Sequence, residues 1–259
     1  MIDAHGHISD PRLEAVAEQL IDNLRRRGLK QIILGGVGPD EWLRQESLKK
    51  RYPDFIVPAI GIHPWTVRDT HDPELENIFS QLEQSASRFP IIGEVGVDFY
   101  RSNAAEDKTR QAHWCERQLD LAARLGKPLV LHAVRGHDVM LQALQKRSGL
   151  RGLIHGFTGS AQIASDYQRF GFIPSLGVRS IQRRTPTDFA WLKKSAFVIE
   201  SDAPSNHLQV VDAETVAESW IQDLNSVAAF LGKLWSMDPQ GVWELSDQNL
   251  SLIGLRQSS

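Results

Sequence analysis

Eight short, mostly apolar segments recur along this 259-residue chain, and helical or loop segments separate them. We expect strands at residues 2–4, 31–35, 55–60, 91–96, 129–132, 152–155, 172–176 and 197–200. Continuous apolar strands that alternate with helices are typical of a parallel sheet covered on both faces. Eight such units favour a closed (β/α)8 barrel, with a doubly wound open sheet as the main alternative.

Apolar residues at helical spacing predict helices between these strands. We expect helices over residues 13–27, 40–51, 74–87 and 107–125, others beginning near His137 and Ala161, and a helical tail from about Ala213. No linker or shift in composition divides the chain. The prediction is therefore an α/β fold in one domain over residues 1–259, a TIM-type barrel with extra C-terminal helices.

Charge and cysteine content limit the function classes. The formal net charge is −3, so any nucleic acid would be bound through a local patch or a metal ion. Cys115 is the only cysteine, which excludes an intrachain disulfide and suits a reducing cytoplasm. We find no apolar run of about 18 residues and no apolar region of a signal peptide, so no membrane span is expected.

Ionisable residues lie in or at the ends of the predicted strands. His5 and His7 follow the first strand one residue apart, so both can face the same side. Four other residues occupy corresponding places on later strands: Glu94, His132, His155 and Asp202. The carboxyl ends of barrel strands converge on one mouth, so these side chains predict a metal site there.

This ligand set exceeds what one tetrahedral ion needs, and a carboxylate such as Glu94 can bridge two ions. Two ions about 3.5–4 Å apart can clamp the attacking and leaving oxygens of a displacement. We therefore expect hydrolysis by a metal-activated water and a cofactor of two divalent ions. Zn²⁺, Mn²⁺ and Mg²⁺ all suit such a site. A Gly-x-Ser-x-Gly elbow, which would carry a serine nucleophile, is absent from the sequence.

The chain resembles the TatD-type metal-dependent deoxyribonucleases, a branch of the amidohydrolase-like barrel hydrolases. The motifs that carry the resemblance are residues 3–7 (DAHGH), 61–64 (GIHP), 92–100 (IGEVGVDFY), 155–160 (HGFTGS) and 200–204 (ESDAP), with Gln111, Gln118 and His132 between them. They occur in family order over about the first 205 residues, and the two longest motifs are the most specific.

The resemblance implies roles for individual residues. One ion would be held by His5, His7, Glu94 and Asp202, and the second by Glu94, His132 and His155. Asp202 would also act as general base toward the attacking water. His63 would face the scissile phosphate, and Asp98 and Tyr100 would support ligands or contact substrate. The implied substrate is DNA, taken as a single strand or from a 3′ end.

Three departures from the family pattern affect the substrate side. The family usually has an arginine two positions after the histidine of the fifth strand, where this chain has Val134. Either Arg135 takes over the phosphate contact or that contact is lost. Ser201 replaces the usual threonine. After Pro204 the family's Arg-Gly and Asn-x-Pro are missing, and His207 is one candidate for a substitute polar contact.

Two other functions remain open at this point. A barrel hydrolase acting on an amide, ester or lactone would use the same metal site, and the altered loop after Pro204 allows it. A non-catalytic barrel that binds a partner is the second alternative. Arg179, Arg183 and Arg184 follow the seventh strand and are candidates for binding a phosphodiester, and Trp65 is a candidate for stacking on a base. No sequence feature specifies an oligomeric state.

Overall fold

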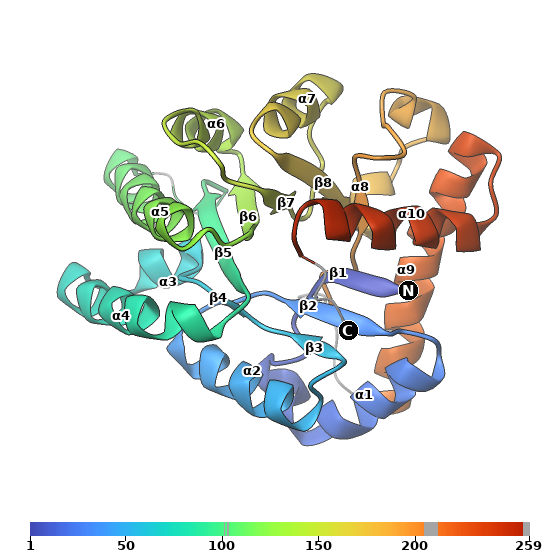
Figure 1. Ribbon diagram of the computed structural model, residues 1–259, viewed down its shortest axis with the longest axis horizontal. Coiled ribbons are helices and arrows are strands. Elements are labelled where there is room, and N and C mark those ends of the chain that lie inside the picture. Colours follow the sequence, from blue (N-terminus) through green and yellow to red (C-terminus); the bar gives the residue numbers. More distant parts are fainter. Residues whose placement is uncertain (101, 103, 205–211, 256–259) are drawn as a thin grey trace.

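Parallel strands form a ring at the centre of the molecule, and helices surround it (Figure 1). The computed structural model describes residues 1–100, 102, 104–204 and 212–255. The strands are β1 (Ile2–Gly6), β2 (Gln31–Leu34), β3 (Ile56–Val57), β4 (Ala59–Ile60), β5 (Ile91–Asp98), β6 (Leu129–Val134), β7 (Gly152–Ile154), β8 (Phe172–Leu176) and β9 (Val198–Ile199). They pair in the orders β1-β2-β3 and β4-β5-β6-β7-β8-β9, and every pairing is parallel.

The third expected strand is divided at Pro58. Residues 55–60 were predicted to be continuous, but β3 pairs with β2 and β4 pairs with β5. Proline has no backbone N–H and cannot donate to a strand ladder. The two halves therefore occupy one position in the ring, and the ring has the eight positions of the predicted (β/α)8 barrel. The predicted fold class is confirmed.

Between β9 and β1 the ring closes without a pairing of the two strands. Two backbone hydrogen bonds join the end of β1 to the segment that follows β9: Asp202 N donates to His5 O at 3.0 Å, and His7 N donates to Ala203 O at 2.7 Å. We call this junction the seam. It brings the start of the chain beside residues about two hundred positions later, at the end of the barrel where the ionisable residues lie.

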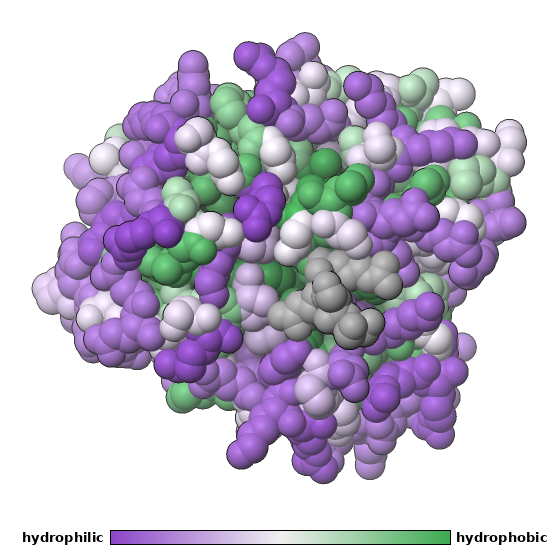
Figure 2. Space-filling view, viewed as in Figure 1, coloured by the Kyte–Doolittle hydropathy of each residue, from purple (hydrophilic) through white to green (hydrophobic). Residues whose placement is uncertain are grey.

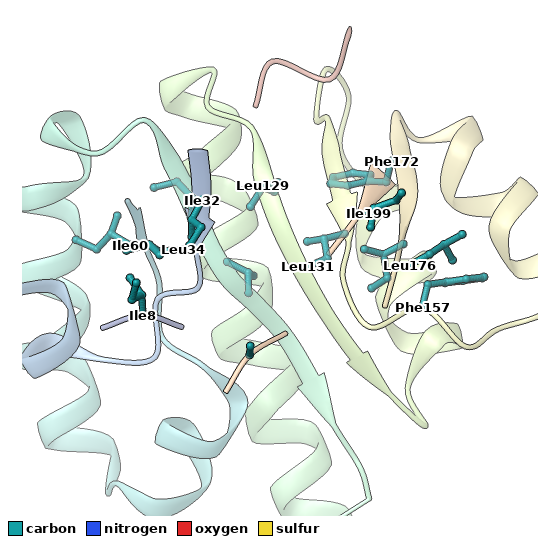
Figure 3. Close-up of a cluster of buried hydrophobic side chains, with 14 of the residues drawn as sticks. Ile8, Ile32, Leu34, Ile60, Leu129, Leu131, Phe157, Phe172, Leu176 and Ile199 are labelled. Atoms are coloured by element: carbon teal, nitrogen blue, oxygen red, sulfur yellow. The ribbon is translucent and has the colours of Figure 1, made fainter. Parts of the chain in front are cut away.

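Alternation along the strands separates two hydrophobic layers. Ile32 and Leu34 face outward to the helices, as do Leu129 and Leu131 (Figure 3). Their neighbours Ile33 and Val130 fill the barrel interior. Both layers are almost completely buried.

Ten α-helices are formed by the described residues. They are α1 (Ala17–Arg26), α2 (Pro39–Arg51), α3 (Pro64–Asp69), α4 (Asp72–Ser85), α5 (Ala105–Leu125), α6 (His137–Gln145), α7 (Ala161–Arg169), α8 (Val178–Ile181), α9 (Ala213–Trp235) and α10 (Pro239–Leu252). The first expected helix, over 13–27, begins as a 3₁₀ helix (Pro11–Val16). The short helices α3 and α8 were not predicted, because four to six residues are too few to show a period.

Helix α10 closes the amino-terminal end of the barrel. Leu250, and Ile253 and Leu255 just beyond α10, join the interior layer, and Asp247 Oδ1 accepts a hydrogen bond from Ile2 N at 3.1 Å. On the face seen in Figure 2, hydrophilic residues cover most of the surface and hydrophobic residues show mainly between them. No helix in the described ranges is long and apolar enough to cross a membrane.

Candidate metal centre

Two strand irregularities turn ligand candidates into the barrel mouth. The β5–β6 register shifts between Gly93 and Val95, and Ile92 and Val95 both face the outer layer although they are three positions apart. The extra residue lets Glu94 point inward. The β1–β2 register shifts between Asp3 and Gly6, so His5 turns inward even though Ala4 also lines the interior. His132 and His155 need no such device, because they follow the inward-facing Val130 and Leu153 by two residues.

Glu94 is the centre of the site. Its Oε2 lies 2.7 Å from His155 Nε2, 3.4 Å from His132 Nδ1, and 3.7 Å from both His5 Nε2 and His63 Nε2. Its Oε1 lies 3.5 Å from His7 Nε2. The two oxygens of one buried carboxylate thus face imidazoles that come from β1, β6 and the segments after β1, β4 and β7.

Asp202, from the segment after β9, completes the cluster on the side of His5 and His7. Its Oδ1 lies 3.6 Å from His7 Nε2 and 3.8 Å from His5 Nε2. Asp202 follows β9 and has a left-handed backbone, with φ +53°. Such backbone conformations in residues other than glycine concentrate at functional sites. The structure therefore brings all six predicted metal ligands together.

These residues fit divalent ions. Three groups of residues each have ligand atoms that all lie within 4.8 Å of one another. The groups are His5, His155 and Asp202; His5, His7 and Glu94; and His63, Glu94 and His132. Both ring nitrogens of His5 and the Oε1 of Glu94 are buried without a hydrogen-bond partner among the described residues. Buried polar atoms normally have partners, so these atoms are suited to coordination.

Gly35 makes room for the cluster. A Cβ at this position would lie 2.4 Å from His7 Cε1, 2.6 Å from Glu94 Oε1 and 2.7 Å from His5 Cε1. The backbone at the end of β2 therefore forms one wall of the site, and only glycine leaves space for these three side chains.

Burial and mutual charge set the protonation of the cluster. Burial alone would raise the pKa of Glu94, but His155 and His5 outweigh burial and hold that pKa well below its usual range. Burial, reinforced by His155, lowers the pKa of His5 well below normal. Burial also opposes protonation of His7, yet hydrogen bonding with Asp202 and Glu41 raises its pKa well above normal. An ionised carboxylate among close imidazoles is an environment made for cations.

Carboxylates outside the cluster face the far nitrogens of two histidines. Glu41 Oε1 lies 3.7 Å from His7 Nδ1, and Asp98 Oδ2 lies 3.5 Å from His132 Nε2. Against the effect of burial, Asp98 and Glu94 raise the pKa of His132 to about 9. A carboxylate behind a ligating histidine fixes the orientation of its ring. Glu41 was not found from the sequence, because it lies in α2 and reads there as a solvated residue of the first helical turn.

His63 has a defined tautomer. Its Nδ1 accepts a hydrogen bond from Trp65 N at 3.1 Å, as the N-cap of α3. Burial lowers the pKa of His63 to about 3, so the ring is neutral. A neutral imidazole that accepts at Nδ1 carries its proton at Nε2. The Nε2–H faces the cluster and suits hydrogen bonding to an oxygen better than metal ligation.

A cavity of about 310 Å³ opens from the cluster. Trp65, Tyr100 and Asp98 line it, and Trp65 Nε1 donates to Asp98 Oδ2 at 2.7 Å. Arg12 and Arg179 line it too; Arg179 Nη1 lies 3.9 Å from Asp202 Oδ2. Arg12 was not singled out from the sequence, because it precedes the first expected helix.

The other basic candidates lie outside the cavity lining. The Arg135 guanidinium stacks 4.6 Å from the centre of the Tyr100 ring, so it reaches the cavity only through that tyrosine. Arg184 Nη2 donates to Thr158 O at 2.8 Å. Of the three candidate arginines after β8 (Arg179, Arg183 and Arg184), only Arg179 lines the cavity. His207, the candidate for a substitute contact, lies outside the described residues.

Comparisons with known proteins agree with this geometry. The family model described as "TatD related DNase" matches residues 2–253. An uncharacterized metal-dependent hydrolase, YjjV of Escherichia coli, is 28% identical over 207 residues, which is 78% of this chain and 79% of that protein. Its crystal structure superposes with a TM-score of 0.78 at 25% identity and covers 98% of this chain and 97% of that one.

Two further relatives have names that state an activity. Human deoxyribonuclease TATDN3 is 24% identical over 260 residues, covering 96% of this chain and 92% of that protein. The 3′-5′ ssDNA/RNA exonuclease TatD of Edwardsiella piscicida is 28% identical over 162 residues, covering 62% of this chain and 61% of that protein.

Proposed function

The chain belongs to the family of TatD-related DNases, and from this premise we propose that it is a metal-dependent hydrolase that cleaves the phosphodiester bonds of DNA. The observation that carries the proposal is the position of Glu94, whose Oε2 has imidazole nitrogens of four histidines within 3.7 Å. We propose that all 259 residues serve this activity as one hydrolase domain.

We assign the ligands in two groups. His5, His7, Glu94 and Asp202 would hold one ion, and Glu94, His132 and His155 would hold a second. Divalent ions bound there supply a Lewis acid and lower the pKa of a water molecule toward neutrality. The separate directions of the two Glu94 oxygens, one toward His7 and one toward His155, support the bridging assignment.

Asp202 is the proposed general base. Hydrogen bonding with His7 and the nearby histidines outweigh its burial and hold its pKa well below the usual range. It is therefore ionised at neutral pH and can accept a proton from the attacking water. It lines the cavity from the side of Arg179, so the guanidinium is placed to balance charge on the same side.

Other residues of the cavity lining are the proposed substrate contacts. His63 would donate from Nε2–H to a phosphate oxygen, where charge accumulates during the displacement. Tyr100 would contact the nucleotide with Arg135 stacked behind it. Asp98 would hold Trp65 and His132 in place, since it contacts both.

A single strand or a 3′ end is the proposed form of the substrate. The cavity of about 310 Å³ suits one nucleotide better than a duplex, and the Edwardsiella relative is named for that activity. We also propose a cytoplasmic location, because the single cysteine is a buried free thiol and no disulfide is formed.

The test is a nuclease assay on labelled DNA after chelation, with Mg²⁺, Mn²⁺ and Zn²⁺ restored one at a time. A linear single strand, the same strand circularised, and a duplex separate attack on an end from internal cleavage. We expect chelation to abolish cleavage, one of the metals to restore it, and the circle to survive. His132→Ala should be inactive, whereas His113→Ala, on the outer surface of α5, should behave as wild type.

The same preparations decide between the proposal and its alternatives. Turnover of an amide, ester or lactone without any DNA cleavage would replace the nuclease function with that of a carbonyl hydrolase. Absence of any bound metal, together with unchanged behaviour of His132→Ala, would indicate a non-catalytic barrel.

A further inference from the structure

Asp3 is a buried carboxylate that the proposed mechanism does not use. It lies on β1 between two interior-facing residues and points the other way, toward the helix layer. Its Oδ1 accepts hydrogen bonds from His5 N at 3.1 Å and from Ser201 N at 3.0 Å. Its Oδ2 accepts from Ser201 Oγ at 2.6 Å and from Trp220 Nε1 at 2.7 Å.

Every partner of Asp3 is a donor. Two are backbone N–H groups and one is an indole N–H, none of which can accept. The fourth, Ser201 Oγ, is a hydroxyl that lies 2.6 Å from Asp3 Oδ2, much closer than the 3.5 Å to His5 O, so Asp3 is its better acceptor. An ionised carboxylate satisfies four donors at once, but an amide would turn its NH₂ group against two of them.

Three of these four hydrogen bonds reach beyond β1. They join β1 to the segment after β9 and to α9, at separations of 198 and 217 positions along the chain. Gly6 makes the approach of Trp220 possible, because a Cβ there would lie 2.8 Å from Trp220 Cζ2. On one strand Asp3 holds the backbone N–H of His5, and on the other it holds the residue before Asp202.

We propose that Asp3 is a positioning residue, which fixes the spacing of His5 and Asp202 across the seam with Trp220 as its support from α9. The ring nitrogen of His5 and the Asp202 carboxylate lie 3.8 Å apart, and the two backbone hydrogen bonds of the seam join the segments that carry them. The inference rests on the proposed metal site and extends it to a residue that touches neither ion nor substrate.

A pair of tryptophan substitutions tests this role. Trp220→Phe removes the indole N–H and keeps most of the buried ring. Trp243→Phe is the matched control, since Trp243 is equally buried, lies on the other C-terminal helix, and has an Nε1 without a hydrogen-bond partner in the part of the chain described. Mn²⁺ and Zn²⁺ binding is measured separately by calorimetry, beside the melting temperature of each metal-free protein.

We expect Trp220→Phe to weaken metal binding several-fold and Trp243→Phe to leave it unchanged. Asp3→Asn should weaken it about 10–100-fold, the usual loss for a residue that orients a ligand. In the double variant Asp3→Asn/Trp220→Phe, metal affinity should recover part of that loss, because the donor opposite the new NH₂ group is gone. A residue that only stabilised the fold would lower the melting temperature and leave metal affinity unchanged.

Equal metal affinity for the two tryptophan variants, or wild-type affinity for a folded Asp3→Asn, would overturn the proposal. If Asp3→Asn does not fold, the tryptophan pair decides alone. A wild-type protein that binds neither metal would instead refute the proposed function, so the two failures are distinguishable.

Discussion

Glu94 is the residue on which both halves of the site depend. It is buried, its pKa is held low by the histidines around it, and its two oxygens face different ligand candidates. Residues that merely orient a metal ligand cost about 10–100-fold in affinity or activity when removed. Removing a ligand shared by both ions should cost more.

Glu94→Ala should therefore lose DNA cleavage by more than about 100-fold with every metal. Initial rates on labelled single-stranded DNA, with each metal at saturation, measure the loss. Glu116→Ala, on the solvent side of α5, serves as the control and should retain wild-type rates. Activity retained by Glu94→Ala with any metal would contradict the bridging assignment.

Gly35→Ala should disturb the same residues without removing any ligand. The added methyl group would overlap His7, Glu94 and His5, and overpacking a buried site costs about 1–3 kcal/mol in the free energy of unfolding. We expect reduced metal content and a lower urea midpoint. Gly38→Ala is the matched control, because its Cβ would meet only Thr66, at ordinary distances of 3.6 and 3.8 Å. Equal metal content in the two variants would show that the space left by Gly35 is not needed to position His7, Glu94 and His5.

Cys115 offers a pH-dependent test that does not involve the metal. Burial raises the pKa of its thiol to about 12. The reactive thiolate is therefore scarce in the folded protein even at pH 9, where an exposed thiol is largely ionised. An aromatic disulfide reagent should modify denatured protein within seconds and native protein far more slowly, both at pH 7 and at pH 9. Rapid labelling of native protein would show that Cys115 is accessible.

At the scale of elements, helix α5 supports two strand ends. Gln118 Oε1 accepts from Ile62 N at 2.7 Å and its Nε2 donates to Ile62 O at 3.0 Å, directly before His63. Two turns earlier on the same face of α5, Gln111 Oε1 accepts from Asp98 N at 2.8 Å. Buried amides of this kind replace strand pairing where the chain leaves the sheet.

Gln118→Ala should lower the free energy of unfolding by about 2 kcal/mol or more, because it leaves the N–H and C=O of Ile62 buried and unpaired. Urea titration followed by circular dichroism measures the change. Gln84→Ala, on the exposed surface of α4, should lie within about 0.5 kcal/mol of wild type. A similar midpoint for the two variants would show that Ile62 finds other partners.

The regular spacing of apolar residues in strands and helices could be read from the sequence, but the register shifts within strands could not. Apolar runs predicted eight strand positions, and the strand ends carried the ionisable residues that the structure brings together. Strict alternation of side chains places His132 and His155 inward, but it would turn Glu94 and His5 outward. A register shift in β5 turns Glu94 inward, and one in β1 turns His5 inward. A shift of one residue has no period of its own, so the chain pattern does not show it.

Contacts across long separations were also hidden. Glu41 and Asp3 are acidic residues that a sequence pattern assigns to a helix surface and a motif start. Their partners lie on other elements: Ser9 Oγ donates to Glu41 at 2.7 Å, and Trp220 donates to Asp3. The motif similarity indicated candidate ligands that the fold brings together, but it could not indicate which neighbours hold them.

At the scale of the whole molecule, bound ions would cross-link parts of the chain that are distant in sequence. The ligand candidates come from β1, β5, β6 and the segments after β7 and β9. A ligand that binds only the folded state stabilises it by RT ln(1 + [L]/Kd), about 2.7 kcal/mol at one hundred times Kd. Metal binding should therefore be visible in thermal stability without any substrate.

Removing metal with a chelator should lower the melting temperature, and adding Mn²⁺ or Zn²⁺ to the dialysed protein should restore it in a concentration-dependent manner. Differential scanning calorimetry measures both changes. The restored increment should be smaller in Glu94→Ala, which lacks the shared carboxylate. An identical melting temperature with and without metal in the wild type would show that the cluster binds ions too weakly to couple to folding.

The seam also sets when this protein becomes active during its synthesis. The residues that hold the strand of His5 and His7 in register, Ser201 and Trp220, are synthesised about two hundred positions after that strand. A nascent chain therefore carries half a nuclease site that nothing yet completes.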